Sequence, residues 1–208
     1  MSDQAVVPNH HAHYRGFKGV SGLVAALSMA VGRENDAGFV ARAGGLAPTD
    51  VVVDIGCGPG AAARHAARLG ATVTGVDPAP VMLRVARMLA RGPAVRFVEG
   101  TAEELPLPDA SATLVWTIAS VHHWGDLDAA LREVQRVLQP GGRFVAVERA
   151  TQPGASGLAS HGWTDEQAAA FAQQCRDDGF GNVHVEHDRA NRRRPLVAVV
   201  ATAALRDA

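Results

Sequence analysis

The sequence predicts an α/β fold built on a doubly wound, mostly parallel sheet. Short apolar runs alternate with helical patterns from Asp50 onward, and strands that alternate with helices form right-handed parallel units. The last two apolar runs are separated only by the short polar segment 187–194, so they should pair antiparallel. We therefore expect a Rossmann-like, seven-stranded sheet with one antiparallel strand, and ligands beyond the carboxyl ends of its strands.

Each element has a local reason in the sequence. The mostly β-branched run 51–55 is followed by glycine, which is typical of a buried strand. Gly70 should cap the alanine-rich helix that precedes it. A capping box, Thr164-Asp-Glu-Gln167, begins the last helix, and Pro140-Gly141-Gly142 should turn the chain into the fifth strand. The predicted strands cover residues 51–55, 71–76, 95–99, 113–119, 143–148, 182–186 and 195–202, and the predicted helices cover residues 61–69, 79–91, 126–138 and 164–178.

Two regions divide the 208 residues, a length that suits one ordinary domain. Residues 1–49 precede the alternating pattern, and their glycine-punctuated apolar segments predict short helices over the ligand edge of the sheet. We expect this N-terminal helical cap to admit the substrate, and residues 50–208 to form the ligand-binding domain.

Composition narrows the class of protein. A formal net charge of -1 gives no electrostatic footprint for nucleic acid. The two cysteines, Cys57 and Cys175, lie far apart and one belongs to a glycine turn, so a reducing interior is expected. The start of the chain has no secretory pattern, and no apolar run is long enough to cross a membrane. We expect a cytoplasmic protein; its oligomeric state does not follow from the sequence.

One carboxylate decides which ligand the glycine turn accepts. In the stretch "VVVDIGCGPG", Asp54 precedes Gly56 and Gly58. The pattern also satisfies the dinucleotide fingerprint, with Asp77 further on to hold a ribose. However, a carboxylate about 4 Å from a pyrophosphate costs on the order of 4 kcal/mol at an effective dielectric of 20. Asp54 therefore favours a cationic ligand.

S-adenosyl-L-methionine has the required chemistry, because an ammonium and a sulfonium accompany its ribose and adenine. Gly56 and Gly58 would allow the backbone to approach the methionine part. Asp77 would accept hydrogen bonds from both ribose hydroxyls.

Four ordered motifs between Asp50 and Glu148 add a family resemblance. They are "VVDIGCGPG", "VTGVDPAPVML", "VEGTAEELPLPDAS" and "LREVQRVLQPGGRFVAVE". With them the sequence resembles the class I S-adenosylmethionine-dependent methyltransferases, in the small-molecule group that includes enzymes of ubiquinone and menaquinone biosynthesis. The resemblance implies transfer of a methyl group to a small organic acceptor.

The resemblance also implies the cofactor contacts. Thr101 and Ala102 would meet the adenine edge, and Thr117 the methionine end. The family commonly has Asp where Thr101 stands, which implies a weaker hydrogen bond from the adenine amine. The complete implied set is Asp54, Gly56, Cys57, Gly58, Asp77, Pro78, Thr101, Ala102 and Thr117.

The candidate catalytic residues are histidines and one tyrosine. His122 and His123 follow the fourth strand at the ligand edge, where a histidine can take a proton near neutral pH. Tyr14 belongs to the N-terminal segment that would close over the acceptor. The histidines beside it, at positions 10, 11 and 13, have no nearby acid or cysteine, so we expect no metal site.

Two other functions stay open on the sequence alone. The glycine turn and Asp77 also suit an oxidoreductase that binds a nicotinamide dinucleotide. A non-catalytic S-adenosylmethionine-binding domain would carry the same cofactor residues and no methyltransferase activity.

Overall fold

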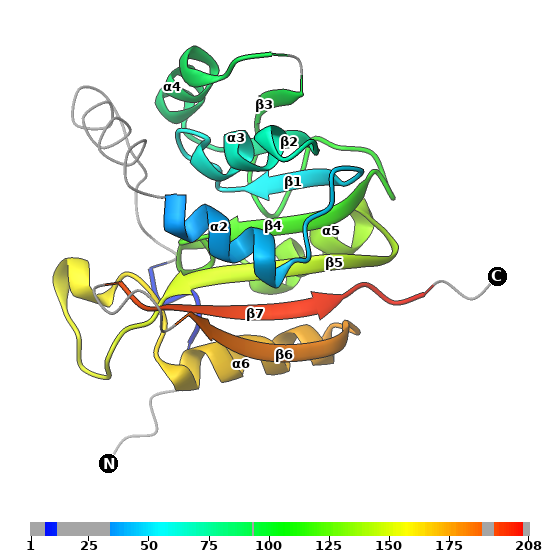
Figure 1. Cartoon of the computed structure of the whole chain (residues 1–208). Helices are drawn as coiled ribbons and strands as arrows, with labels where there is room; N and C mark the ends of the chain where they lie inside the picture. The colour runs from blue at the N-terminus through cyan, green and yellow to red at the C-terminus, as the bar shows by residue number, and fades with distance from the viewer. Residues whose placement is uncertain (1–6, 12–33, 93, 189–193, 206–208) are drawn as a thin grey trace.

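The structure is a computed structural model that describes residues 7–11, 34–92, 94–188 and 194–205 (Figure 1). Tyr14 and most of the predicted N-terminal cap lie outside the described residues. The division at residue 49 and the role of Tyr14 therefore stay predictions.

A single mixed sheet forms the centre of the fold, in the strand order β3-β2-β1-β4-β5-β7-β6. Neighbouring strands from β3 to β5 pair in parallel, and β7 pairs antiparallel with both β5 and β6. The predicted seven strands with one antiparallel member are confirmed. The strands are β1 Val51–Ile55, β2 Thr72–Asp77, β3 Val95–Glu99, β4 Ala112–Ile118, β5 Leu138–Arg149, β6 Gly181–Asp188 and β7 Leu196–Thr202.

Helices cover both faces of this sheet and bury an apolar core on each (Figure 1). On one face, Val40, Ala63 and Leu83 come from three different helices and pack in one core with strand residues such as Trp116. On the other face, Leu131 and Phe171 pack against Phe144. The first face carries α2 Glu34–Ala43, α3 Ala61–Arg68 and α4 Pro80–Leu89, and the second carries α5 Leu127–Val137 and α6 Asp165–Asp177.

The helix ends confirm the predicted caps. Gly70, at φ +101°, follows α3 and donates to Ala67 O, while Ala71 N donates to Ala66 O; these two bonds form a Schellman motif. At α6 the Thr164 hydroxyl accepts from Gln167 N and the Gln167 side chain accepts from Thr164 N, so the capping box is present.

The predicted turn at Pro140 is part of a strand. β5 begins at Leu138, which pairs with Ala112, and the register then shifts before Leu114 pairs with Arg143. Gly141 takes φ +73° at this irregularity. Leu138 thus gains a strand partner, and α5 ends one residue earlier than predicted, at Val137.

The topology places the ligand edge where it was expected. Strand order reverses between β1 and β4, and both run in the same direction. Crevices at such switch points, beyond the carboxyl ends of the strands, bind ligands in open α/β sheets. Of the helices in the described ranges, none has the length and apolar character to cross a membrane.

Candidate functional site

The turn after β1 is held in a left-handed conformation by three glycines. Gly56, Gly58 and Gly60 have φ values of +66°, +51° and +77°. A Cβ at Gly56 would lie 2.2 Å from Ser120 Oγ, and one at Gly60 would lie 2.6 Å from the Phe97 ring. At these two positions the chain's own side chains occupy the space that a Cβ would need.

Asp77 fastens this turn to the end of β2. Its Oδ2 accepts a hydrogen bond from Gly58 N at 2.8 Å, and its Oδ1 accepts one from Ala79 N at 2.8 Å. Burial raises the pKa of Asp77, and the two backbone donors oppose that rise. Since each carboxylate oxygen has two lone pairs, the geometry leaves capacity for ribose hydroxyls, but Asp77 also has a structural role.

A small cavity of about 50 Å³ opens beside the glycine turn. It can hold a small polar group and a few waters, but not a whole nucleoside. It contains the side chain of Asp54 and a second carboxylate that sequence reasoning missed, Asp36 of α2, which pairs with Arg194 at 3.4 Å. The lining is Asp36, Asp54, Gly56, Cys57, Gly58, Pro59, Ala61, Ala62, Ile118 and Ala119.

Asp54 is the buried acid of this cavity. The desolvation of its side chain raises its pKa to about 7; the Trp116 indole opposes the rise, and the nearby Asp77 adds to it. Within the described ranges, neither Asp54 Oδ2 nor Trp116 Nε1 has a hydrogen bond of ordinary geometry. Burying a polar atom without a partner is costly, so Asp54 Oδ2 is poised for a donor or a cation in the cavity.

The other predicted cofactor residues are distributed along the same edge. Cys57 lines the cavity with a buried thiol, whose pKa burial raises well above its usual value. Pro78 and Thr101 are exposed after β2 and β3, and Ala102 is packed into the core. Thr117 is fully buried, its Oγ1 lacks a hydrogen bond within the described ranges, and it does not line the cavity. The alternation along β4 turns it away from the face that Trp116 occupies.

The side chain of His122 is buried and held by a carboxylate rather than exposed to the cavity. It lies in the short helix η1, Val121–His123, and is buried. Its Nδ1 lies 2.9 Å from Oε2 of Glu148, a fully buried carboxylate at the end of β5. Sequence reasoning missed Glu148, although its place at the end of a predicted strand next to β4 was a usable signal.

Further histidines gather around His122. Burial first, and then the neighbouring His122, lower the pKa of His123 to about 4. His161, which follows the short helix η2 Gly157–Ser160, has its ring centroid 5.6 Å from that of His123 and 4.4 Å from that of His11. The sequence did not reveal that His161 and His11 join the histidines after β4, because the four residues come from three distant segments.

A larger cavity, of about 400 Å³, opens at the opposite end of the sheet, where β5 begins and β7 ends. It is lined by the start of β5 and by residues after β7, including Leu138, Arg136 and Ala203. The glycine turn, the buried acid and the histidines are all absent from its lining. The smaller cavity is therefore the candidate site.

Comparison with known proteins agrees with this placement. Residues 53–146 match the model of a methyltransferase domain family. A demethylmenaquinone methyltransferase of Thermus thermophilus is 46% identical over 92 residues, which cover 43% of this chain and 42% of the relative. The matched part spans 39–42% of the length of the first curated relatives.

Solved structures extend the likeness to nearly the whole fold. A SAM-dependent methyltransferase from Aquifex aeolicus superposes with a TM-score of 0.72 over 88% of this chain and 98% of its own, at 15% identity. The [4+2]-cyclase SpnF superposes with a TM-score of 0.68 over 94% of this chain and 87% of its own, at 19% identity. Residues 53–146 therefore match the model of a methyltransferase domain family, and the chain has the Rossmann-like fold of a SAM-dependent methyltransferase of known structure.

Proposed function

We propose that this protein transfers the methyl group of S-adenosyl-L-methionine to a small organic acceptor. The observation that carries the proposal is Asp54, a buried carboxylate in a cavity beside the glycine turn, with Oδ2 lacking a hydrogen bond in the described ranges. The same turn falls within the segment that matches the methyltransferase domain family.

The residues present fit the cationic end of the cofactor. An ammonium group placed in the cavity would give Asp54 Oδ2 the donor it lacks, and would offset the cost of ionising a buried acid. The cavity of about 50 Å³ suits that end alone. The ribose and adenine would extend along the edge toward Asp77, Thr101 and Ala102.

The chain's own residues mainly position the reactants. The cofactor supplies an activated methyl group on a sulfonium, so the protein needs no strong electrophile of its own. Asp54 would fix the amino-acid end, Asp77 would hold both the glycine turn and the ribose, and the turn would hold the reacting carbon at one place on the edge.

The acceptor would lie on the side of the edge where the histidines gather. His123 is half-buried, and its pKa of about 4 means that the ring is neutral at pH 7. A neutral imidazole can accept a proton or orient a hydroxyl, although a base of this pKa is weak. His122 already has Glu148 on its Nδ1, which suits a positioning role.

Two alternatives keep a physical basis. The glycine turn could hold a nicotinamide dinucleotide, but the ionised form of Asp54 in the cavity opposes a diphosphate. The [4+2]-cyclase SpnF has the same fold, so the fold by itself does not establish methyl transfer.

Calorimetry separates the cofactor classes. We expect the protein to bind S-adenosylhomocysteine at micromolar concentration and to show no heat with NAD⁺ or NADP⁺. Tight binding of a dinucleotide without adenosylhomocysteine binding would overturn the proposal. Turnover is then measured as release of adenosylhomocysteine with a panel of phenol, amine, thiol and quinol acceptors; cofactor binding without any turnover would favour the non-catalytic alternative.

We further propose that residues 1–49 cover the acceptor and that the protein works in the cytoplasm. α2 supports the first point, because its Asp36 lines the cofactor cavity while Val40 packs on the sheet. Cys57 and Cys175 are both free and buried, which suits a reducing compartment.

A further inference from the structure

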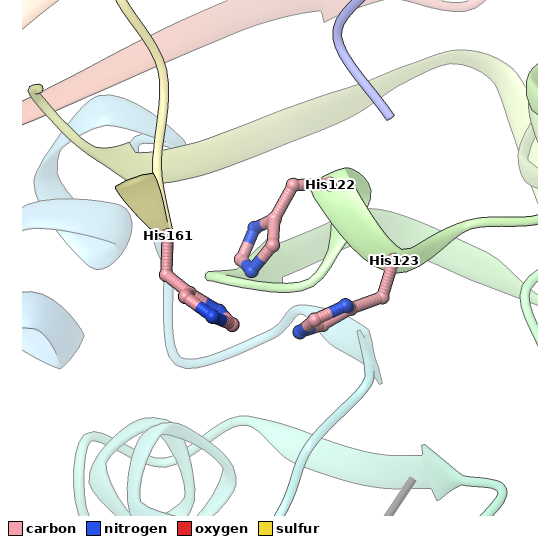
Figure 2. A group of neighbouring side chains, drawn as sticks. All are labelled: His122, His123 and His161. Atoms are coloured by element: carbon pink, nitrogen blue, oxygen red, sulfur yellow. The ribbon is translucent and has the colours of Figure 1, made fainter. Parts of the chain in front are cut away.

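We propose that His122, His123 and His161 bind one divalent transition-metal ion of the zinc class. One ring nitrogen of each residue lies within 4.8 Å of a ring nitrogen of both others. Figure 2 shows the three imidazoles turned toward one another, two from η1 and one from the loop after η2. The test is separate from that of methyl transfer, since metal binding is measured without cofactor or acceptor. A metal on His123 would occupy the ring nitrogen that otherwise accepts a proton.

Glu148 prepares His122 as a ligand. The carboxylate Oε2 lies 2.9 Å from His122 Nδ1, and both side chains are buried. When Nδ1 donates to this carboxylate, the lone pair of the ring is on Nε2. Metal-binding histidines commonly have such a carboxylate or a backbone carbonyl on the second ring nitrogen, which fixes the tautomer and the ring orientation.

His123 has the second kind of support. Its Nδ1 lies 3.5 Å from the backbone oxygen of His11. Two of the three proposed ligands thus have a hydrogen-bond acceptor on the ring nitrogen that does not bind the metal: the Glu148 carboxylate for His122 and the His11 carbonyl for His123.

The backbone also fixes the position of His161. The next residue, Gly162, has φ +147°, and a Cβ there would lie 2.2 Å from Arg149 O. Trp163 N donates to Arg149 O, and Thr151 N donates to Trp163 O. These bonds hold the loop against the end of β5, close to Glu148, so the third ligand comes from a constrained segment.

The three ring nitrogens need to move only a short distance to reach the spacing of a zinc site. Zinc–nitrogen bonds of about 2.0–2.1 Å in a tetrahedral site place the ligand nitrogens about 3.4 Å apart. The 4.8 Å limit therefore requires the imidazoles to approach by roughly 1.4 Å at most, which rotation of the half-buried rings of His123 and His161 can supply.

The ligand set favours zinc-class ions over magnesium or calcium. Imidazole suits zinc, cobalt, nickel and copper, whereas magnesium and calcium prefer oxygen ligands. Three protein ligands leave a fourth position open for water or another ligand, as in catalytic rather than structural zinc sites.

The test is zinc titration of the full chain, prepared without a metal-binding tag and stripped with EDTA. We expect one Zn²⁺ per chain with a Kd of about 1 µM or below, and a visible Co²⁺ spectrum typical of tetrahedral coordination. Outer-shell changes alone cost about 10–100-fold in metal affinity. Glu148→Gln should therefore weaken binding by about 10-fold or more, and His161→Ala, which removes a ligand, by about 100-fold or more.

His184→Ala is the matched control, because this histidine is 53% exposed on β6, away from the cluster. It should bind zinc as the wild type does. His123→Ala is the second ligand variant, and circular dichroism establishes that each variant is folded. Binding below one ion per chain in the wild type, or equal zinc affinity in the wild type and in the folded His161→Ala and His123→Ala variants, would overturn the proposal.

Discussion

The two polar sites at the carboxyl edge of the sheet lie on opposite faces and were built in different ways. Asp54 is on the face covered by α2 and α3, within one continuous strand–turn–helix segment. Glu148 and the histidines are on the face covered by α5 and α6, where distant segments meet. The glycine turn with Asp54 and the pair His122 and His123 are each local in sequence and could be predicted. Asp36 and His161 join these sites only on folding and could not be predicted.

Ser120 connects the two regions. Its Oγ lies where a Cβ at Gly56 would go, and the same oxygen accepts a hydrogen bond from Trp124 Nε1 at 3.2 Å. It immediately precedes η1, which carries two of the histidines. A change at Gly56 should therefore affect both sites, whereas a change at Asp54 should affect one.

The largest expected effect is that of Gly56→Ala. The positive φ and the contact with Ser120 should together lower the free energy of unfolding by about 3–5 kcal/mol, as measured by urea denaturation. Gly92→Ala is the control, because Gly92 has φ +86° but a Cβ there would have no neighbour within 4 Å, and it should cost about 1–2 kcal/mol. Equal losses for both variants would show that Ser120 does not constrain the turn.

Asp54→Asn should separate the two sites. Loss of the carboxylate should weaken adenosylhomocysteine binding by about 3 kcal/mol, or roughly 100-fold, in calorimetry at pH 8. Zinc binding by the histidines should stay within twofold of the wild type. A parallel loss of zinc affinity would mean that the two regions are not independent.

The same substitution should stabilise the empty protein. The pKa of Asp54 is about 7 in the folded state against an ordinary value of 3.8, so the folded state holds this proton more tightly. Its contribution to stability falls as pH rises from about 4 to 7, and ionisation then costs on the order of 4 kcal/mol. At pH 8, Asp54→Asn should raise the free energy of unfolding by about 1–3 kcal/mol, because the amide is uncharged but still needs partners. A lower free energy of unfolding in Asp54→Asn would contradict the claim that ionisation of the buried Asp54 destabilises the empty protein.

Asp77 should show a mixed phenotype. Asp77→Ala should weaken cofactor binding by roughly 1.5–3 kcal/mol and should also loosen the turn, since Gly58 N and Ala79 N lose their acceptor. Asp77→Asn retains one acceptor oxygen and should lose less. Unchanged affinity in Asp77→Ala would remove this residue from the site.

The smallest predicted effect is the pH dependence of cofactor binding. Below about pH 7 the carboxyl of Asp54 is protonated in the empty protein, so binding of an ammonium group must release that proton. Affinity should fall about fivefold between pH 7 and pH 6 beyond any change in Asp54→Asn. A titration series at constant ionic strength measures the difference, and identical profiles would contradict it.

The sequence predicted those helices and strands whose ends are set by neighbouring residues, and it failed where distant residues set them. β1, the glycine turn and α3 are specified by neighbouring residues, and their bounds were predicted to within a residue. Gly70 and Thr164 determined helix ends through local hydrogen bonds. The start of β5 was missed because Leu138 extends the strand by pairing with Ala112, a non-local contact.

The site shows the same division. Asp54 was recognisable because a carboxylate before a glycine turn has a clear electrostatic consequence. Asp36 could not be placed, because nothing in the sequence shows that the first turn of α2 reaches the cavity. His161 could not be placed either, since its position depends on Gly162 and on the bonds between Trp163 and Arg149.

Proton release on cofactor binding tests the central assignment most directly. Calorimetry at pH 7, in buffers of different ionisation enthalpy, counts the protons exchanged when S-adenosyl-L-methionine binds. With a pKa of about 7 for Asp54 in the empty site, the wild type should release about half a proton more than Asp54→Asn. Equal proton release by both proteins would contradict the assignment of Asp54 as the partner of the cofactor's cationic end.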